Sequence, residues 1–215
     1  MRLLSPLEAR VLGVLVEKQH TVPDSYPLSV NALVLGSNQK TARDPVIEAN
    51  DDDVLTAIDG LKGLSLVFDG SSSRVVKFEH NMARCLRLPG QSVALLAVLM
   101  LRGPQTSAEL RLNCERLHKF ADISSVEGFL DELAAKEPPF VVKLPRAAGE
   151  REGRWAHLLC GEVALPAAGA QTQAFDVSVG AGELAAIKAE QTRLADEVAV
   201  LKALVQRMAT ELGIS

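Results

Sequence analysis

Apolar residues recur at helical spacing near the start of the chain. A run with this spacing follows Ser5 and Pro6 and consists of Leu7, Val11, Leu12, Val14 and Leu15. Serine is a favoured N-cap and proline fits the first helical turn, so we expect a helix that begins here and ends near His20. The breaker-rich stretch 21–27 separates it from a second short helix, which we expect over 28–35.

The next apolar positions predict a third helix and then a hairpin. After the polar stretch 36–50, apolar residues at helical spacing run from Val54 to Leu64, preceded by three aspartates at the positive end of the helix dipole. Two short apolar stretches, 65–68 and 74–78, flank a segment of glycine and serine. That pattern is typical of a β-hairpin.

The same order of elements recurs in the second half of the chain. Helical patterns cover 92–101, 107–117 and a segment from Ser124 onward, and they are followed by apolar strands at 140–144 and 154–159. Three helices and a hairpin make the order of a winged helix. The sequence therefore predicts a mainly α fold with small β-hairpins, built as two tandem winged-helix domains at 1–86 and 87–160.

The C-terminal segment has a different pattern. Residues 161–182 are rich in alanine and glycine and are interpreted as a flexible linker. Residues 183–215 then carry apolar positions spaced alternately by three and four, which predicts a coiled-coil helix. These a and d positions are Leu184, Ile187, Gln191, Leu194, Val198, Leu201, Val205, Met208 and Leu212. We expect a parallel homodimer; the alternative is a helix that packs its apolar stripe on its own chain.

Charge and composition give a broad class rather than a function. The formal net charge is −4, and neither predicted domain is strongly basic, which counts against nucleic acid without excluding it. The three cysteines, Cys85, Cys114 and Cys160, are far apart, as expected in a reducing cytoplasm. Residues 1–6 lack the apolar region of a signal peptide, and the longest apolar run, 93–101, is about half a membrane span. We expect a cytoplasmic protein with no membrane contact.

Catalytic and metal-binding motifs are missing from the sequence. There is no glycine-rich phosphate motif and no HExxH or CxxC, and the four histidines are scattered. Cys114 lies on a predicted amphipathic helix, so a buried thiol is favoured over a nucleophile. Asp51, Asp52 and Asp53 fit dipole-favoured capping better than a cation site. We expect no enzyme activity, no cofactor and no metal.

Several stretches resemble the bacterial YceH-like family of uncharacterised proteins. In the first half they are residues 7–18, residues 21–29, Ser37-Asn38-Gln39-Lys40 and Arg43-Asp44-Pro45. In the second half they are residues 101–106, residues 116–122 and Ala156-His157-Leu158. The resemblance covers roughly residues 5–162 and its motifs are specific. It implies a tandem winged-helix fold and brings almost no function.

A winged helix suggests DNA binding, but the helices expected to be its recognition helices are acidic. The third helix normally enters the major groove with its N-terminal residues at base edges, and here those residues include Asp51 to Asp53 in one domain and Glu127 in the other. Carboxylates repel a phosphate backbone. Contacts with nucleic acid would instead come from a polar loop and the two wings. The candidate residues are Asn38, Gln39, Lys40 and Arg43 in the loop, Arg74 and Lys77 in the first wing, and Arg146, Arg151 and Arg154 in the second.

Two partner classes therefore remain open. The first hypothesis is a DNA-associated transcriptional regulator, dimerised by the coiled coil and contacting DNA through loops and wings. The alternative is a protein–protein adaptor that uses acidic winged-helix surfaces. Affinity for phosphate falls steeply with salt, whereas a buried protein interface is less sensitive, so salt dependence separates them.

Overall fold

In the computed structural model, the described residues are 2–70, 75–146, 150 and 152–163. Arg74 and Arg151 lie outside them, as do most of the predicted linker and the whole predicted coiled coil with its nine heptad positions. The coiled coil and the homodimer therefore stay predictions from the sequence.

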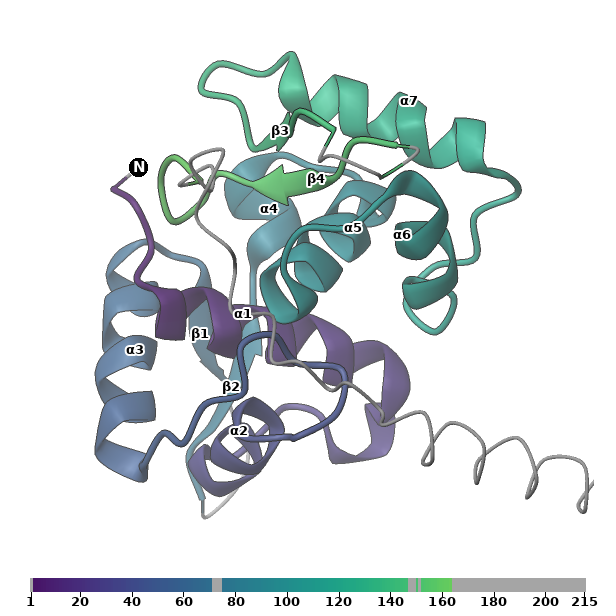
Figure 1. Cartoon of the computed structure of the whole chain (residues 1–215). Coiled ribbons are helices and arrows are strands. Elements are labelled where there is room, and N and C mark those ends of the chain that lie inside the picture. Colours follow the sequence, from purple (N-terminus) through teal and green to yellow (C-terminus); the bar gives the residue numbers. More distant parts are fainter. Residues whose placement is uncertain (1, 71–74, 147–149, 151, 164–215) are drawn as a thin grey trace, which may run out of the picture. The chain divides into compact units, whose positions relative to one another are not determined.

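Helix α1 (Pro6–Thr21) begins and ends close to where the sequence predicts. Its N-terminus is closed by a capping box, in which the Glu8 amide donates to Ser5 Oγ at 3.1 Å and the Ser5 amide donates to Glu8 Oε2 at 2.7 Å. Residues 8–16 are all buried. The helix is therefore surrounded by the rest of the described structure instead of lying on its surface (Figure 1).

The rest of the first half follows the predicted order with shifted boundaries. A short 3-10 helix, η1 (Pro23–Ser25), leads to α2 (Val30–Ser37), which begins two residues later than expected because Ser29 is its N-cap. Helix α3 (Asp51–Gly63) is capped by Asn50. Strands β1 (Val67–Gly70) and β2 (Lys77–His80) pair antiparallel, with Val67 opposite His80, and the short helix α4 (Met82–Leu86) follows.

The second half contains the same kinds of elements. Helices α5 (Gly90–Arg102), α6 (Ser107–Asn113) and α7 (Ile123–Ala134) precede strands β3 (Val141–Lys143) and β4 (Trp155–His157), which also pair antiparallel. Helix α6 is shorter than predicted, because the chain continues after Asn113 in turns. The mainly α fold with two small antiparallel sheets is confirmed.

One backbone detail is repeated in both halves. Just before α2, Leu28 exchanges two hydrogen bonds with Phe78 of β2, at 3.0 and 2.7 Å. Just before α6, Gln105 exchanges two hydrogen bonds with Trp155 of β4, also at 3.0 and 2.7 Å. In each half, the residue that leads into the second helix thus lies beside the returning strand of the hairpin.

The two halves share a single buried core. Helix α1 packs against α5 as well as α2 and α3 (Figure 1). The contact with α5 is close at Gly13, where an added Cβ would lie 2.9 Å from Leu101 Cγ. The predicted domain boundary after residue 86 falls at the end of α4, between segments that belong to this one core, and the described residues form one compact unit.

No helix among the described residues combines the length and apolar character needed to cross a membrane.

Candidate functional site

The 38–50 loop contains the predicted functional loop, residues 37–43, except for its first residue, and is held firmly against α1 and α5. Asn38 uses its whole side-chain amide on Ala49, donating to the carbonyl at 2.8 Å and accepting from the amide at 2.9 Å. The Asp44 amide donates to the Leu101 carbonyl at 2.8 Å. These bonds fix both ends and the middle of the loop, so its conformation is set by the fold.

Arg43, a predicted DNA contact, is buried inside this loop. Its side chain is 0% exposed and pairs with Glu17 of α1, with Nη2 2.7 Å from Oε2 and Nη1 3.2 Å from Oε1. It also donates to the Gly36 carbonyl, the Ala42 carbonyl and the Gln39 side chain. Burial raises the pKa of Glu17, but the hydrogen bond and charge of Arg43, together with those of Lys18, outweigh burial and hold that pKa below its ordinary value. Arg43 therefore has no donor to offer to a phosphate.

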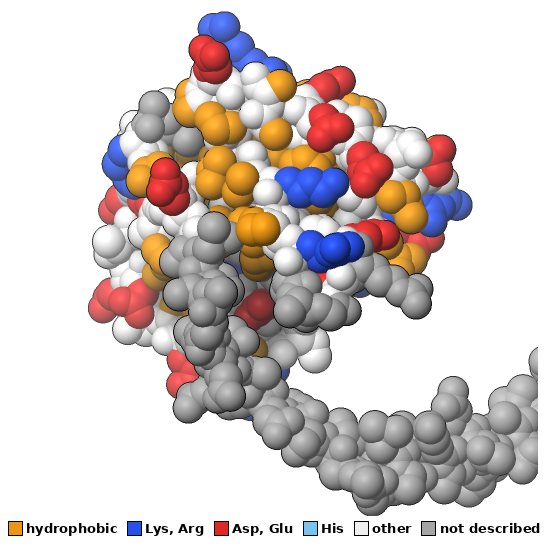
Figure 2. Space-filling model, turned by 45° about the horizontal axis from the view of Figure 1, so that its top comes forward, with side chains coloured by type: hydrophobic (Ala, Val, Ile, Leu, Met, Phe, Trp, Pro, Cys, Tyr) orange, Lys and Arg blue, Asp and Glu red, His pale blue; other side chains and the backbone are white. Residues whose placement is uncertain are grey.

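The other predicted contacts are divided between engaged and open side chains. Arg154 is paired with two carboxylates, Glu109 at 2.9 Å and Glu150 at 3.3 Å, which neutralise its charge. Lys40 and Arg146 are exposed and Lys77 is half-buried. Of the five predicted cations among the described residues, two are thus engaged by carboxylates of the chain itself. Figure 2 shows Lys and Arg scattered among Asp and Glu on the face in view.

The exposed faces of the two third helices are acidic. On α3 the exposed side chains include Asp51, Asp52, Asp53 and Asp59. On α7 they include Asp131 and Glu132. Asp53 forms a capping box with Asn50, which supports the capping interpretation of the aspartate run over the cation site. Neither helix carries an exposed lysine or arginine within its bounds.

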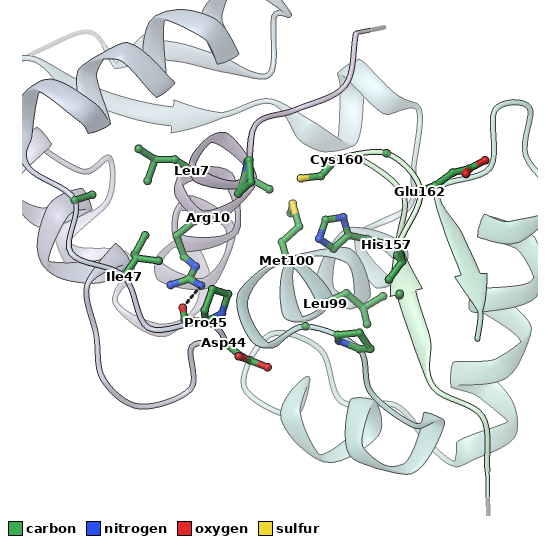
Figure 3. Close-up of a pocket in the computed structure, with 18 of the residues that line it drawn as sticks. Leu7, Arg10, Asp44, Pro45, Ile47, Leu99, Met100, His157, Cys160 and Glu162 are labelled. Carbon is green, nitrogen blue, oxygen red and sulfur yellow. Dashed lines mark hydrogen bonds between the residues drawn. The ribbon is translucent and has the colours of Figure 1, made fainter. Parts of the chain in front are cut away.

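A cavity lies between the two halves of the described structure, and we call it the central pocket (Figure 3). Its volume is about 530 Å³ and its lining is mostly apolar. One wall comes from the start of α1 and from the 38–50 loop, and the other from α5, β4 and the residues after β4. Its main apolar side chains are Leu7, Pro45, Ile47, Leu99 and Met100.

Arg10 is the one cation among the described residues that line the central pocket. It is 3% exposed and donates to the Ser37 carbonyl at 3.1 Å and the Pro45 carbonyl at 2.6 Å, while its Nε has no partner among the described residues. Burial lowers the pKa of Arg10, and the charge of Arg43 lowers it further, while that of Asp44 raises it. Arg10 thus ties the loop to α1 and leaves one buried donor unsatisfied.

The opposite wall holds two titratable side chains. His157, at the end of β4, points into the pocket beside Met100 (Figure 3), and its Nδ1 is buried without a partner among the described residues. Burial lowers the pKa of His157 to about 4, so the ring is neutral at physiological pH. Burial, with a smaller contribution from Glu8, raises the pKa of the Cys160 thiol, which is therefore not an activated nucleophile.

The rim of the central pocket is acidic. Asp44, Glu48, Asp53 and Glu162 are exposed lining residues that come from the loop, from α3 and from the chain after β4. No exposed lysine or arginine is among the described lining residues. The pocket is therefore an apolar hollow surrounded by negative charge.

Cys114 is buried as predicted. Its side chain is 0% exposed, its Sγ donates to the Ala94 carbonyl at 3.7 Å, and burial raises its pKa to about 12. A thiol with these properties fills core space and does not act as a nucleophile.

Sequence reasoning did not find the central pocket. Its walls come from segments near residues 7, 45, 100 and 157, which no local pattern relates. The one available signal was Arg10, a cation inside the apolar run of α1, because a charge at a buried helical position needs a special partner.

Comparison with known proteins connects the whole chain to bacterial relatives. Residues 4–150 match the family described as "Protein of unknown function, DUF480". The chain is 67% identical over 214 residues to a UPF0502 protein of Burkholderia multivorans, covering 100% of this chain and 91% of that one. It is 67% identical to a UPF0502 protein of Burkholderia ambifaria and 68% identical to one of Paraburkholderia phytofirmans, with the same coverage.

Proposed function

The chain belongs to the DUF480 (UPF0502) family of uncharacterised bacterial proteins, and from its own residues we propose that it is a non-enzymatic protein–protein adaptor built on two winged-helix units. The family brings no activity with it. The proposal therefore rests on the fold and surfaces of this chain.

The repeated backbone pairing supports the winged-helix assignment. In each half three helices precede a hairpin, and the residue before the second helix pairs with the returning strand, as Leu28 does with Phe78 and Gln105 does with Trp155. The pairing supports the proposal because a winged helix has a short first strand, before its second helix, that completes the sheet. By this assignment α3 and α7 correspond to the recognition helices of DNA-binding winged-helix proteins.

The observation that carries the adaptor proposal is the charge of those helices. Their exposed faces present Asp51, Asp52 and Asp59 on α3 and Asp131 and Glu132 on α7. A helix in the major groove lies between two phosphate backbones, so carboxylates there oppose binding. The predicted loop contact Arg43 and the wing contact Arg154 are also occupied by carboxylates of their own chain. A protein partner with basic or polar surface fits this charge better than DNA.

A DNA-associated regulator remains the second candidate, favoured by the winged-helix order itself and by the exposed side chains of Lys40 and Arg146. Fluorescence anisotropy of a labelled random duplex separates the two functions. We expect no binding by the purified full chain, even at low salt. Binding at low salt that weakens steeply at physiological salt would favour the regulator.

Capture from a lysate of Burkholderia multivorans then tests the adaptor directly. We expect a reproducible partner that survives physiological salt. Cross-linking mass spectrometry should place its contacts on α3, α7 or the central pocket. Contacts spread evenly over the surface would contradict the proposal, because a specific interface concentrates in one patch.

We also propose that the heptads of residues 183–215 join two copies in parallel, which would make the adaptor bivalent. The measurement is the mass of the full chain in solution by light scattering. Leu194→Asp with Leu201→Asp should convert a dimer to a monomer, because each places a charge at a predicted a or d position. An unchanged mass would mean that another surface holds the copies together or that the chain is monomeric.

A further inference from the structure

We propose that the central pocket binds an extended peptide of a partner protein, one that places a large apolar side chain in the pocket and lysine or arginine over its rim. This deepens the adaptor function and rests on it. Three features of the pocket carry the proposal: its apolar interior, its fixed loop wall and its charged rim.

The interior suits an apolar anchor. The volume of about 530 Å³ lies within the range in which proteins enclose ligands, roughly 300–1,000 Å³. Ile47 and Leu7 face Leu99 and Met100 across this space (Figure 3). Buried apolar and aromatic anchors supply most of the affinity in peptide and protein interfaces. A leucine, methionine or phenylalanine side chain would therefore supply the main contact.

The wall formed by the 38–50 loop is already rigid. Asn38 and Arg43 fix the loop to the fold, and Arg10 holds Pro45 beside the pocket. Little conformational entropy is then lost when an occupant binds, and binding to a preformed pocket is stronger for that reason.

The carboxylates of the rim favour a positively charged partner. Two of the rim's four exposed carboxylates belong to residues 44 and 48 of the 38–50 loop, one to residue 53 of α3 and one to residue 162 after β4, and no exposed cation balances them among the described lining residues. Each exposed ion pair adds only about 0–1 kcal/mol, so the rim selects and steers while the apolar contact holds. An extended peptide that enters the pocket crosses this rim, so lysine or arginine beside its apolar anchor would meet the carboxylates.

The experiment is a selection of random peptides of about twelve residues, displayed on phage, against the immobilised full chain. Enriched peptides are then synthesised with a fluorophore, and their dissociation constants are measured by anisotropy. We expect them to combine a large apolar residue with a net positive charge.

Matched variants of the full chain locate the binding site. Ile47→Asp places a charge in the pocket wall, and Val46→Asp places the same charge on the neighbouring residue, which is 54% exposed and does not line the pocket. We expect Ile47→Asp to weaken binding at least about tenfold and Val46→Asp to change it less than about twofold. Neither residue belongs to the buried core, and thermal unfolding verifies that both variants fold.

A second pair tests the rim. Glu48→Lys with Glu162→Lys should weaken the binding of the basic peptides about fivefold and reduce the salt dependence of that binding. Asp24→Lys with Glu79→Lys makes the same change of charge at two exposed residues that do not line the pocket, and should leave the affinity for the peptides within about twofold of wild type.

Several outcomes would overturn the proposal. No enrichment, enrichment of acidic or uncharged peptides, or equal binding to wild type and Ile47→Asp each contradict it. Strong competition by a synthetic peptide of residues 164–182 would assign the pocket to the chain itself. A partner captured from lysate by Ile47→Asp as well as by wild type would leave the adaptor function standing and reject only this site.

Discussion

At the scale of single residues, a basic side chain in a polar loop can serve either the fold or a partner. Arg43 and Lys40 stand three positions apart in the same loop, and the sequence predicts the same role for both. Arg43 is buried against Glu17, whereas Lys40 is exposed. Burial and pairing, which depend on distant segments, separate the two roles.

Replacing each residue by alanine measures the difference. Arg43→Ala removes the two Arg43 bonds to the half-buried Glu17 carboxylate and the bond to the Gly36 carbonyl, so we expect a loss of about 3–5 kcal/mol in the free energy of unfolding. Lys40→Ala should change it by less than about 0.5 kcal/mol. Urea unfolding followed by circular dichroism gives both values. Equal effects would mean that the bonds of Arg43 to Glu17 and to the loop do not stabilise the fold.

His157 gives the fold a dependence on pH. Burial lowers its pKa to about 4, so between pH 7 and pH 5 the unfolded chain takes up a proton at this position and the folded chain does not. Stability is therefore highest above the ordinary histidine pKa and falls as the pH drops. We expect His157→Gln to reduce this fall by about 2 kcal/mol, measured from urea unfolding at pH 7 and pH 5. An unchanged fall in stability would contradict this role of His157. The pKa of His80 is also lowered to about 4, so His80 accounts for part of the fall that remains in the variant.

At the scale of elements, the sequence predicted each helix that carries a clear cap and apolar period. Ser5 marks the start of α1, and the aspartates mark the start of α3. Helix α2 was misplaced by two residues because Ser29, not an earlier residue, is its cap. Helix α4 was not predicted, since its five residues are too few to show a period. The central pocket and the hydrogen bond from Arg10 to Pro45 form where elements distant in the sequence meet, so no local pattern could show them.

The charge on α3 is the property that we expect to separate this protein from DNA-binding winged helices. Asp51→Lys, Asp52→Lys and Asp59→Lys together reverse its exposed face but leave the capping residue Asp53 intact. If α3 has the position of a recognition helix, the triple variant should bind a random duplex, whereas wild type should not bind it. The affinity of the variant should fall steeply as the salt concentration rises. Anisotropy at several salt concentrations measures this.

The control for that variant makes the same change of charge at scattered exposed positions, Asp24→Lys, Glu79→Lys and Glu115→Lys. It should bind the duplex much more weakly than the α3 variant. Equal binding by both would mean that net charge alone, and not the position of α3, decides the interaction.

At the scale of the whole molecule, the packing of α1 on α5 makes two similar halves depend on each other. The sequence predicts two domains from the repeated pattern, and that pattern is silent on whether their cores are separate. In the structure the buried residues of both halves form one cluster. We therefore expect residues of the two halves to unfold in one cooperative transition.

The single tryptophan tests this expectation, because Trp155 is buried in the second half and reports unfolding there. Ile58→Ala removes a fully buried side chain from α3, which packs mainly on α1, α2 and β1, and should cost about 2–5 kcal/mol. With one cooperative unit, the urea midpoint seen by Trp155 fluorescence should fall by about 1–2 M, together with the midpoint seen by circular dichroism. Leu130→Ala in α7 is the positive control, since it must move the Trp155 signal in either case. A Trp155 midpoint that moves with Leu130→Ala and stays fixed with Ile58→Ala would show that the halves unfold separately, and the α1–α5 contact would then be an interface between two domains rather than the centre of one.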